Sequence, residues 1–324
     1  MKILSSPEEK KLDASLRPRA WSEYVGQEKI KRNIQIIIRA AKERGEASLE
    51  HLLFYGPSGL GKTTISHLIA EELKAPIRVV SGPSLGRPGD LAAILTSLSE
   101  GEILFVDEIH RLNKMCEEMI YPALESFKLN FILGKGFMAQ TTEINLPKFT
   151  LIGATTRVAL LSSPLRNRFG ATFQLGFYGM EDIEEIIRRS AKILGVEIDK
   201  EAVKIIANSS RFTPRTANRL LKRVRDYAQV EGKRIDAKTA KEALSSLEID
   251  EIGLELGDRK MLEAIIKKFN GGPVGIQSLA AAAMEDEQAI LDIYEPYLMQ
   301  LGFLKRTPRG RVATELAYRH MEKK

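Results

Sequence analysis

A glycine-rich segment that ends in Lys62-Thr63 matches the phosphate-loop pattern G-x-x-x-x-G-K-[ST]. Gly59 and Gly61 let the backbone turn so that its N–H groups converge on phosphate oxygens. Lys62 adds a positive charge for the β- and γ-phosphates, and the Thr63 hydroxyl suits Mg²⁺. Thr64 can bond the α-phosphate from the first turn of the helix expected to follow. The segment therefore predicts a site for ATP and Mg²⁺.

Two acids, Asp107 and Glu108, end an apolar run over residues 103–106. A carboxylate at the carboxyl end of a parallel strand points into the ligand crevice. Asp107 is expected to hold Mg²⁺ through water, and Glu108 to polarise the attacking water as the general base. Such acids are also common at solvated strand ends, but the phosphate loop upstream favours the catalytic interpretation.

Three further residues have chemistry that the local pattern leaves open. Thr156 follows the apolar run at 149–154, so its hydroxyl suits either the γ-phosphate and the attacking water or a plain strand end. Arg215 begins a predicted helix, from which it could close a lid onto the γ-phosphate. A lone arginine such as Arg168 or Arg215 is more often a solvated surface residue.

The elements that position these residues follow from hydrophobic patterning. Apolar strands are expected at 51–55, 102–106 and 149–154, with a helix at 63–73. Strands separated by helices predict a parallel sheet with helices on both faces, hence an α/β ATPase domain over residues 1–179.

The second half of the chain reads as two smaller domains. Residues 180–252 predict an all-α lid domain, and residues 253–324 predict a winged-helix domain with a hairpin turn at 307–310, after a linker at 249–257. The expected helices are 181–194, 200–208, 216–230 and 237–246 in the lid, then 258–270, 276–284 and 287–301.

Composition limits the class of protein. The 324 residues hold one cysteine, Cys116, which excludes an internal disulfide and a multi-cysteine zinc site and fits a reducing cytoplasm. The chain has no apolar run long enough to span a membrane, and residues 1–13 are too charged for a secretion signal. A net charge of +6 permits a nucleic-acid partner without proving one.

Two predicted hairpins suggest partner surfaces. Between residues 302 and 312 there are four cations and no acid, which suits DNA phosphates, although such clusters are usually solvated turns. These cations are Lys305, Arg306, Arg309 and Arg311. The hairpin at 127–146 turns at 134–136 and carries Ile132, Leu133, Phe137 and Met138 near its tip. These apolar residues suggest protein docking, unless the hairpin folds back on its own core.

Taken in order, these segments resemble the AAA+ ATPases, and among them the RuvB family of bacterial Holliday-junction branch-migration motors. The resemblance covers about residues 16–320. Beside the phosphate loop it is carried by Leu16-Arg17-Pro18, Tyr24-Val25-Gly26-Gln27, Asp107-Glu108-Ile109-His110-Arg111-Leu112, Gly153-Ala154-Thr155-Thr156-Arg157 and Thr307-Pro308-Arg309-Gly310-Arg311.

The resemblance implies roles that residue chemistry leaves open. Thr156 would be sensor 1, Arg215 sensor 2, and Arg168 an arginine finger that reaches the ATP of a neighbouring subunit. The nucleotide would also be contacted by Leu16, Arg17, Tyr24, Val25, Glu125, Ser126, Phe127 and Tyr178. The family forms hexamers around duplex DNA, so the resemblance implies an ATP-driven helicase in recombination, DNA repair and the SOS response.

The implied partners are Holliday-junction DNA, a RuvA-like protein at the 127–146 hairpin and a RuvC-like resolvase. Arg306 and Arg311 would be the foremost DNA contacts, with Arg309 beside them. Three positions depart from the family pattern: Ser58 replaces a proline, Ser126 an acid, and Phe212 a glycine just before Thr213-Pro214-Arg215. A β-carbon at Phe212 could alter the approach of Arg215.

Three other functions fit parts of the pattern. Clamp loaders and replication initiators are also AAA+ proteins, but many clamp loaders carry a four-cysteine zinc module that a single cysteine cannot form. Protein unfoldases usually show an aromatic pore loop, and residues 81–89 contain no aromatic residue. A winged-helix transcription regulator with an ATPase switch remains open, and strand displacement would distinguish it from a motor.

Overall fold

The structure is a computed structural model that describes residue 12, residues 14–133 and residues 140–322. The chain forms two compact units by its internal contacts. The ATPase unit comprises Arg17–Gly56 and Leu60–Gly176, and the lid–winged-helix unit holds Leu16, Pro57–Gly59 and the described residues from Phe177 onward. Among the described residues, no helix has the length and apolarity that crossing a bilayer requires.

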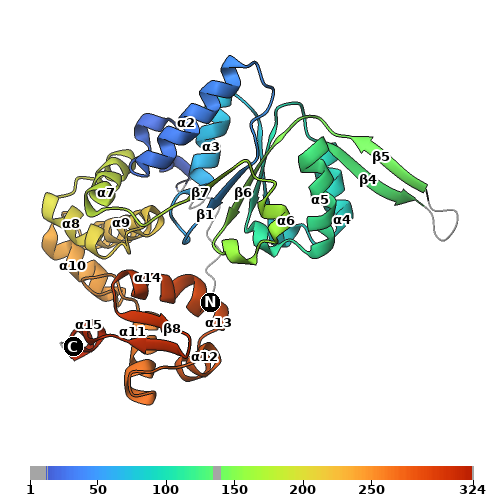
Figure 1. The fold of residues 1–324 in the computed structure, drawn as a ribbon. Helices are drawn as coiled ribbons and strands as arrows, with labels where there is room; N and C mark the ends of the chain where they lie inside the picture. Colours follow the sequence, from blue (N-terminus) through green and yellow to red (C-terminus); the bar gives the residue numbers. More distant parts are fainter. Residues whose placement is uncertain (1–11, 13, 134–139, 323–324) are drawn as a thin grey trace. The chain divides into compact units, whose positions relative to one another are not determined.

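A five-stranded parallel sheet forms the centre of the ATPase unit (Figure 1), and its order within the described residues is β2-β3-β6-β1-β7. This confirms the predicted α/β class and the three predicted strands. The strands are β1 (Leu52–Tyr55), β2 (Ile77–Ser81), β3 (Ile103–Asp107), β6 (Thr150–Thr155) and β7 (Ala171–Gln174). The helices are α2 (Glu28–Glu43), α3 (Lys62–Leu73), α4 (Pro88–Thr96), α5 (Lys114–Ser126) and α6 (Ser163–Arg166).

The central strands β1, β3 and β6 are buried on both faces, because side chains alternate along each strand and helices cover both sides. Leu104 and Val106 of β3 belong to a core with Leu91 of α4 and Ile120 of α5. In Figure 1, α2 and α3 lie on the side of the sheet opposite to α4 and α5. Every residue of β6 is buried, which is the pattern of a central parallel strand.

A two-stranded hairpin, β4 (Lys128–Leu133) and β5 (Gln140–Asn145), extends from the end of α5. Its antiparallel register pairs Lys128 with Asn145, which agrees with the predicted hairpin. The predicted turn at 134–136 and the tip residues Phe137 and Met138 lie outside the described residues.

The lid is all-helical, as its periodicity predicts. Its helices are α7 (Met180–Leu194), α8 (Lys200–Asn208), α9 (Pro214–Val230) and α10 (Ala237–Ser246). The predicted linker at 249–257 is wrong, because this segment is packed. Leu254 is fully buried, and the carboxylate of Asp250 accepts hydrogen bonds from the backbone of Ile252 and Leu254.

The winged-helix domain has its own apolar core, built around residues such as Leu262, Leu279, Leu298 and Ala317. The predicted helices are present, two of them interrupted by π-helical turns, and a final helix follows the wing. The elements are α11 (Leu256–Glu263), η6 (Ala264–Lys268), α12 (Ile276–Ala283), α13 (Glu287–Ala289), η7 (Ile290–Tyr294), α14 (Glu295–Gln300), β8 (Leu304–Thr307), β9 (Gly310–Ala313) and α15 (Glu315–Glu322).

Candidate nucleotide-binding and catalytic site

The phosphate loop connects β1 to α3 through glycines in conformations that other residues rarely adopt. Gly59 and Gly61 have φ values of 84° and 99°. Gly61 is the N-cap of α3 and offers no side chain, which leaves the first amides of the helix to bind an anion. The Lys62 ammonium is buried and donates to the carbonyl of Gly56 at 2.8 Å, so its charge lies within the loop.

The structure brings Glu108, the predicted general base, and Thr156, the predicted sensor 1, together at the carboxyl edge of the sheet. Asp107 is the last residue of β3, and Glu108 follows with φ 50°. The Thr156 hydroxyl donates to Glu108 Oε2 at 3.4 Å, and His110 Nδ1 lies 3.3 Å from the same oxygen. His110 also contacts the Thr155 hydroxyl at 2.8 Å. Two neighbours therefore hold the Glu108 carboxylate at the edge of the sheet where the sequence predicts a general base.

The donors available for a metal are oxygens. Thr63 offers a hydroxyl and Asp107 a carboxylate, and the described residues contain no group of three or more His, Cys, Asp or Glu side chains that could hold a metal ion. At a phosphate loop, Mg²⁺ is typically coordinated by one hydroxyl, water and substrate phosphates, with one carboxylate close by. These residues fit Mg²⁺ and do not form a caged metal site.

The residues predicted around the adenine divide between the two units. In the ATPase unit Tyr24 is buried and contacts Trp21 edge-on, Val25 is half-buried, and Arg17 lies close enough to His67 of α3 to lower its pKa, after burial as the main cause. In the other unit Tyr178 is buried, and the buried Leu16 accepts a hydrogen bond from an arginine of α7.

The predicted sensor-2 residue lies at the start of α9. Arg215 Nη1 donates to the Ser58 hydroxyl at 2.9 Å, within the same compact unit. Phe212, three residues earlier, has the left-handed φ of 53° that glycine adopts more easily. Its carbonyl accepts from Tyr178 N–H at 3.0 Å, and its ring lies 6.4 Å from that of Tyr297.

Arg168 lies toward the amino edge of the sheet, away from the phosphate loop of its own chain. Two residues later, Gly170 N–H donates to the His51 carbonyl, directly before β1. Since β1 spans four residues, its first and last Cα atoms are roughly 10 Å apart. The guanidinium pairs with Glu125 of α5 at 2.8 Å.

Glu125, Ser126 and Phe127 also lie at the amino edge, because the end of α5 is fixed there. Buried His51 accepts from Leu151 N–H and bonds the Leu124 carbonyl, both at 3.0 Å, and burial lowers its pKa. Phe127 is half-buried against the rings of His51 and Phe149. These rings hold Phe127 at the amino edge of the sheet, and its predicted contact with a nucleotide stays a prediction. Glu125 and Ser126 are exposed, and their predicted contacts with the nucleotide also stay predictions.

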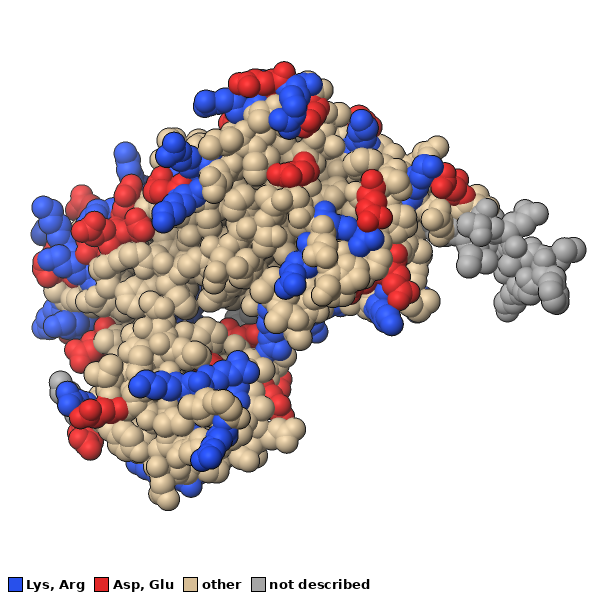
Figure 2. All heavy atoms as spheres, viewed as in Figure 1, with Lys and Arg blue, Asp and Glu red and all other residues tan. Residues whose placement is uncertain are grey.

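The wing of the winged-helix domain separates the predicted DNA contacts into two kinds. Lys305, Arg306 and Arg309 are exposed, and Figure 2 shows Lys and Arg side chains on this part of the visible face. Arg311, the other foremost predicted DNA contact, has a side chain that is 8% exposed and pairs with buried Glu295 at 2.9 Å, so its role as a DNA contact stays a prediction. Arg311 lies opposite Arg306 across the hairpin, and Glu295 offsets the repulsion between them.

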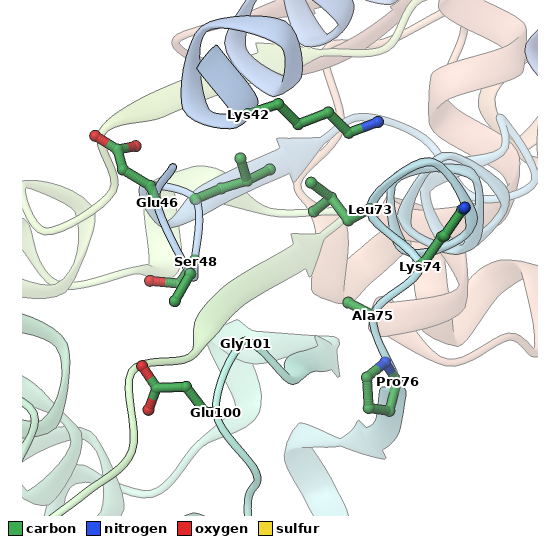
Figure 3. A pocket seen from close by; sticks show the side chains of 11 residues that line it. Lys42, Glu46, Ser48, Leu73, Lys74, Ala75, Pro76, Glu100 and Gly101 are labelled. Carbon is green, nitrogen blue, oxygen red and sulfur yellow. The ribbon is translucent and has the colours of Figure 1, made fainter. Parts of the chain in front are cut away.

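A cavity of about 260 Å³ lies where the chain enters β1, β2 and β3 (Figure 3). Leu49, Pro76 and Gly101 line it, together with charged side chains that already have partners, such as Lys42 with Glu72. These residues precede their strands, so the cavity lies at the amino edge and is separate from the phosphate loop.

The fold and the site together define the class of protein: a phosphate-loop ATPase of the AAA+ type with a helical lid and a winged-helix domain. Family descriptions match all three parts. The RuvB P-loop domain, described as a Holliday junction DNA helicase, matches residues 16–175, the RuvB AAA lid domain residues 178–250, and the RuvB C-terminal winged-helix domain residues 251–322. The chain belongs to the RuvB family, as its sequence predicts.

Individual relatives agree over nearly the whole length. A Holliday junction branch migration complex subunit RuvB from Dehalococcoides mccartyi is 58% identical over 312 residues, which are 96% of this chain and 89% of the relative. The corresponding protein of Chloroflexus aggregans is 55% identical, over 98% of this chain and 91% of the relative. The structure of the Thermotoga maritima RuvB Holliday junction branch migration motor aligns with a TM-score of 0.87 and 48% identity, over 95% of this chain and 98% of that one.

Sequence reasoning missed residues whose partners lie far away in the chain. Buried Arg211 pairs with Asp258, donates to the Gly253 carbonyl and lies 4.9 Å over the Tyr297 ring, which joins the lid to the winged-helix domain. Nothing in its local sequence signals this. His110 was within reach, since it follows Glu108 by two positions in a motif that the sequence singles out.

Proposed function

We propose that this chain is the ATP-driven motor subunit of a complex that moves Holliday junctions along DNA. One observation carries the proposal: the nucleotide site lies at the carboxyl edge of the sheet and Arg168 toward the amino edge. A subunit so built cannot complete its own site and is suited to complete that of a neighbour. A closed ring, which in this family is a hexamer, satisfies every site in this way.

The chemistry follows from the residues at the carboxyl edge. The loop amides and Lys62 bind and orient the phosphates, while Glu108, held by Thr156 and His110, accepts a proton from the attacking water. Mg²⁺, held by Thr63 and Asp107, would neutralise charge on the β- and γ-phosphates. Arg168 of the next subunit would stabilise the charge that develops on the transferred group.

A continuous segment of the lid connects the nucleotide to the DNA-binding domain. Arg215 at the start of α9 would contact the γ-phosphate, and four residues earlier Arg211 is anchored on Asp258 and Tyr297 of the winged-helix domain. We infer that a lid movement on hydrolysis carries the winged-helix domain with it. The exposed cations Lys305, Arg306 and Arg309 would then hold DNA phosphates without reading sequence.

The partners proposed for the chain are four-way junction DNA, a RuvA-like protein at the β4–β5 hairpin and a RuvC-like resolvase. The support for the hairpin is its position: β4 begins directly after α5, and the paired strands extend away from the sheet (Figure 1). That position leaves the hairpin accessible to a partner.

The test compares wild type with Glu108→Gln in two assays: ATP hydrolysis with and without duplex DNA, and dissociation of a synthetic four-way junction with a RuvA-like protein added. For the wild type, we expect DNA to stimulate ATP hydrolysis. With the RuvA-like protein present, we expect the wild type to dissociate the junction and the Glu108→Gln variant not to do so. Normal hydrolysis without junction movement, under conditions in which the chain binds the junction, would contradict the motor and favour an ATPase switch on a winged-helix regulator.

A further inference from the structure

The Arg168 guanidinium makes more contacts within its own subunit than a solvent-facing arginine needs. Its guanidinium lies 4.4 Å from the centroid of the Tyr121 ring, Nη2 pairs with Glu125 at 2.8 Å, and Nη1 donates to the Pro164 carbonyl at 2.7 Å. Its Nε is buried and has no hydrogen-bond partner among the described residues. The side chain is nevertheless 21% exposed, so part of it remains accessible from outside the subunit.

Tyr121 is itself fixed from two directions. Its hydroxyl lies 2.8 Å from Glu117 Oε1 and 3.0 Å from the Ser162 hydroxyl. Ser162 caps α6, because its hydroxyl accepts from Leu165 N–H at 3.2 Å. The ring is therefore anchored to the same short helix that precedes Arg168.

Helix α5 presents Glu117, Tyr121 and Glu125 in one row. Residues four apart lie above one another on a helix face, so this row follows from their spacing. The ring contacts the face of the guanidinium, while the outermost carboxylate contacts its edge. Arginine suits such an arrangement, because a planar cation stacks on an aromatic ring and keeps its edge donors available.

The two contacts on Arg168 differ in how easily they release it. Glu125 is 59% exposed, and an ion pair with so exposed a partner contributes little and is screened by salt. A triphosphate with several negative charges can displace it. The Tyr121 ring carries no charge to be displaced, and its contact leaves the N–H donors on the guanidinium edge available for phosphate oxygens.

We propose that Tyr121 is a positioning residue for the arginine finger: it holds the plane of the Arg168 guanidinium so that its donors meet the neighbouring subunit's γ-phosphate. The inference rests on the proposed function, since it requires Arg168 to act across a subunit interface. Glu125 occupies the Nη2 donor until a phosphate replaces it. Tyr121 touches no substrate and acts only through Arg168.

The test places the two functions of a subunit in separate variants: supplying the arginine finger to a neighbour, and hydrolysing ATP at its own site. Donor subunits carry Glu108→Gln, which silences their own site, and acceptor subunits carry Arg168→Ala, which removes their own finger. Donors in large excess are mixed with acceptors, and ATP hydrolysis is measured. We expect Tyr121→Leu in the donor to lower hydrolysis at least about tenfold, whereas Tyr121→Phe retains the ring face and most of the activity.

The matched control places Tyr121→Leu in the acceptor instead. That subunit has no finger to position, so hydrolysis should equal that of the parent acceptor. If the substitution lowers hydrolysis equally in both subunits, Tyr121 is only structural and the inference is overturned. Full donor activity from Tyr121→Leu overturns it as well.

The failure of the proposed function has its own signature. If Arg168→Ala hydrolyses ATP normally without a donor, the shared site does not exist and the Tyr121 variants are irrelevant. If Arg168→Ala needs a donor and Tyr121→Leu donors serve as well as their parent, only the positioning role fails.

Discussion

Arg168 and Arg311 are both arginines that the sequence marks for an anionic partner, and the structure gives them different surroundings. Arg168 is 21% exposed, stacks on a tyrosine and pairs with a carboxylate that is 59% exposed. Arg311 is 8% exposed and pairs with Glu295, which is 4% exposed. Its backbone N–H donates to the Val274 carbonyl at 2.8 Å, and its carbonyl accepts from Val274 N–H at 2.9 Å.

The difference shows that the partner and its burial, more than the residue type, decide what an arginine can do. A charge paired with an exposed carboxylate can exchange that partner for a phosphate at small cost. A charge paired within the core cannot, because separation would leave both charges desolvated. Arg168 is thus suited to an exchange of partners during a catalytic cycle, and Arg311 to holding the wing on its domain.

The largest expected effect comes from Arg168→Ala. As the proposed arginine finger, Arg168 would stabilise charge on the transferred phosphoryl group, so its loss should lower ATP hydrolysis by about 10³-fold. Since the residue is partly exposed and its ion pair is weak, the free energy of unfolding should change by less than about 0.5 kcal/mol. Steady-state hydrolysis and urea unfolding test the two halves. A large loss of stability with little loss of hydrolysis would show that Arg168, like Arg311, serves mainly to hold the fold together.

For Arg311→Ala the expected loss is in stability. The substitution leaves Glu295 buried without its main partner, which should cost about 3–5 kcal/mol locally. Hydrogen exchange of the β8 and β9 amides should accelerate accordingly. The matched control is the double variant Arg311→Met with Glu295→Leu, which removes both charges and should exchange nearly as slowly as wild type. Equally fast exchange in the double variant would mean that the ion pair is not the cause.

A third arginine, Arg211, makes a pH test possible. Burial raises the pKa of its partner Asp258 to about 6, and Arg211 only partly offsets that effect. A carboxyl with a raised pKa favours the folded state while protonated, so its contribution is complete below about pH 4 and is lost as pH rises through about 6. The loss is about 3 kcal/mol at most.

The measurement is the free energy of unfolding of wild type and Asp258→Asn from pH 4 to pH 8. The wild type should lose stability relative to the variant as pH rises, since asparagine cannot titrate. If stability changes with pH in parallel for the two proteins, Asp258 titrates normally and the contact between the lid and the winged-helix domain is not sensitive to pH.

The smallest effects concern the exposed cations of the wing. Arg306→Ala and Arg309→Ala should each weaken duplex binding by about threefold to tenfold and lower the slope of log affinity against log salt by about one. The Arg311→Met/Glu295→Leu variant should keep the full slope, because the pair that it removes is neutral and buried. Fluorescence anisotropy across a salt series measures all three. A reduced slope in the double variant would instead identify Arg311 as a DNA contact.

Sequence reasoning located the residues whose position depends on local structure. Lys62, Thr63 and Thr156 follow the end of a strand and Asp107 is the last residue of one, and the carboxyl ends of parallel strands share one edge of a sheet. Strand ends and turns are local features, which explains why the phosphate loop, the acidic pair and the helices of the lid were predictable.

What sequence reasoning could not supply is burial and partnership at a distance. Arg311 meets a carboxylate sixteen positions earlier, and Arg211 meets one forty-seven positions later. The stretch around Asp250 reads as a linker by composition, yet His320 contacts its carboxylate at 3.0 Å. The site that we propose for Arg168 lies in another subunit, and no pattern within one chain locates such a site.

The most direct test of the central claim, that one subunit completes the site of the next, is a mixing experiment with two inactive variants. Arg168→Ala keeps its site and lacks the finger, while Glu108→Gln keeps the finger and lacks the base. Each alone should hydrolyse ATP at about a thousandth of the wild-type rate or less. A mixture should recover a substantial part of that rate. A mixture no more active than its components, in rings shown to contain both variants, would contradict the account.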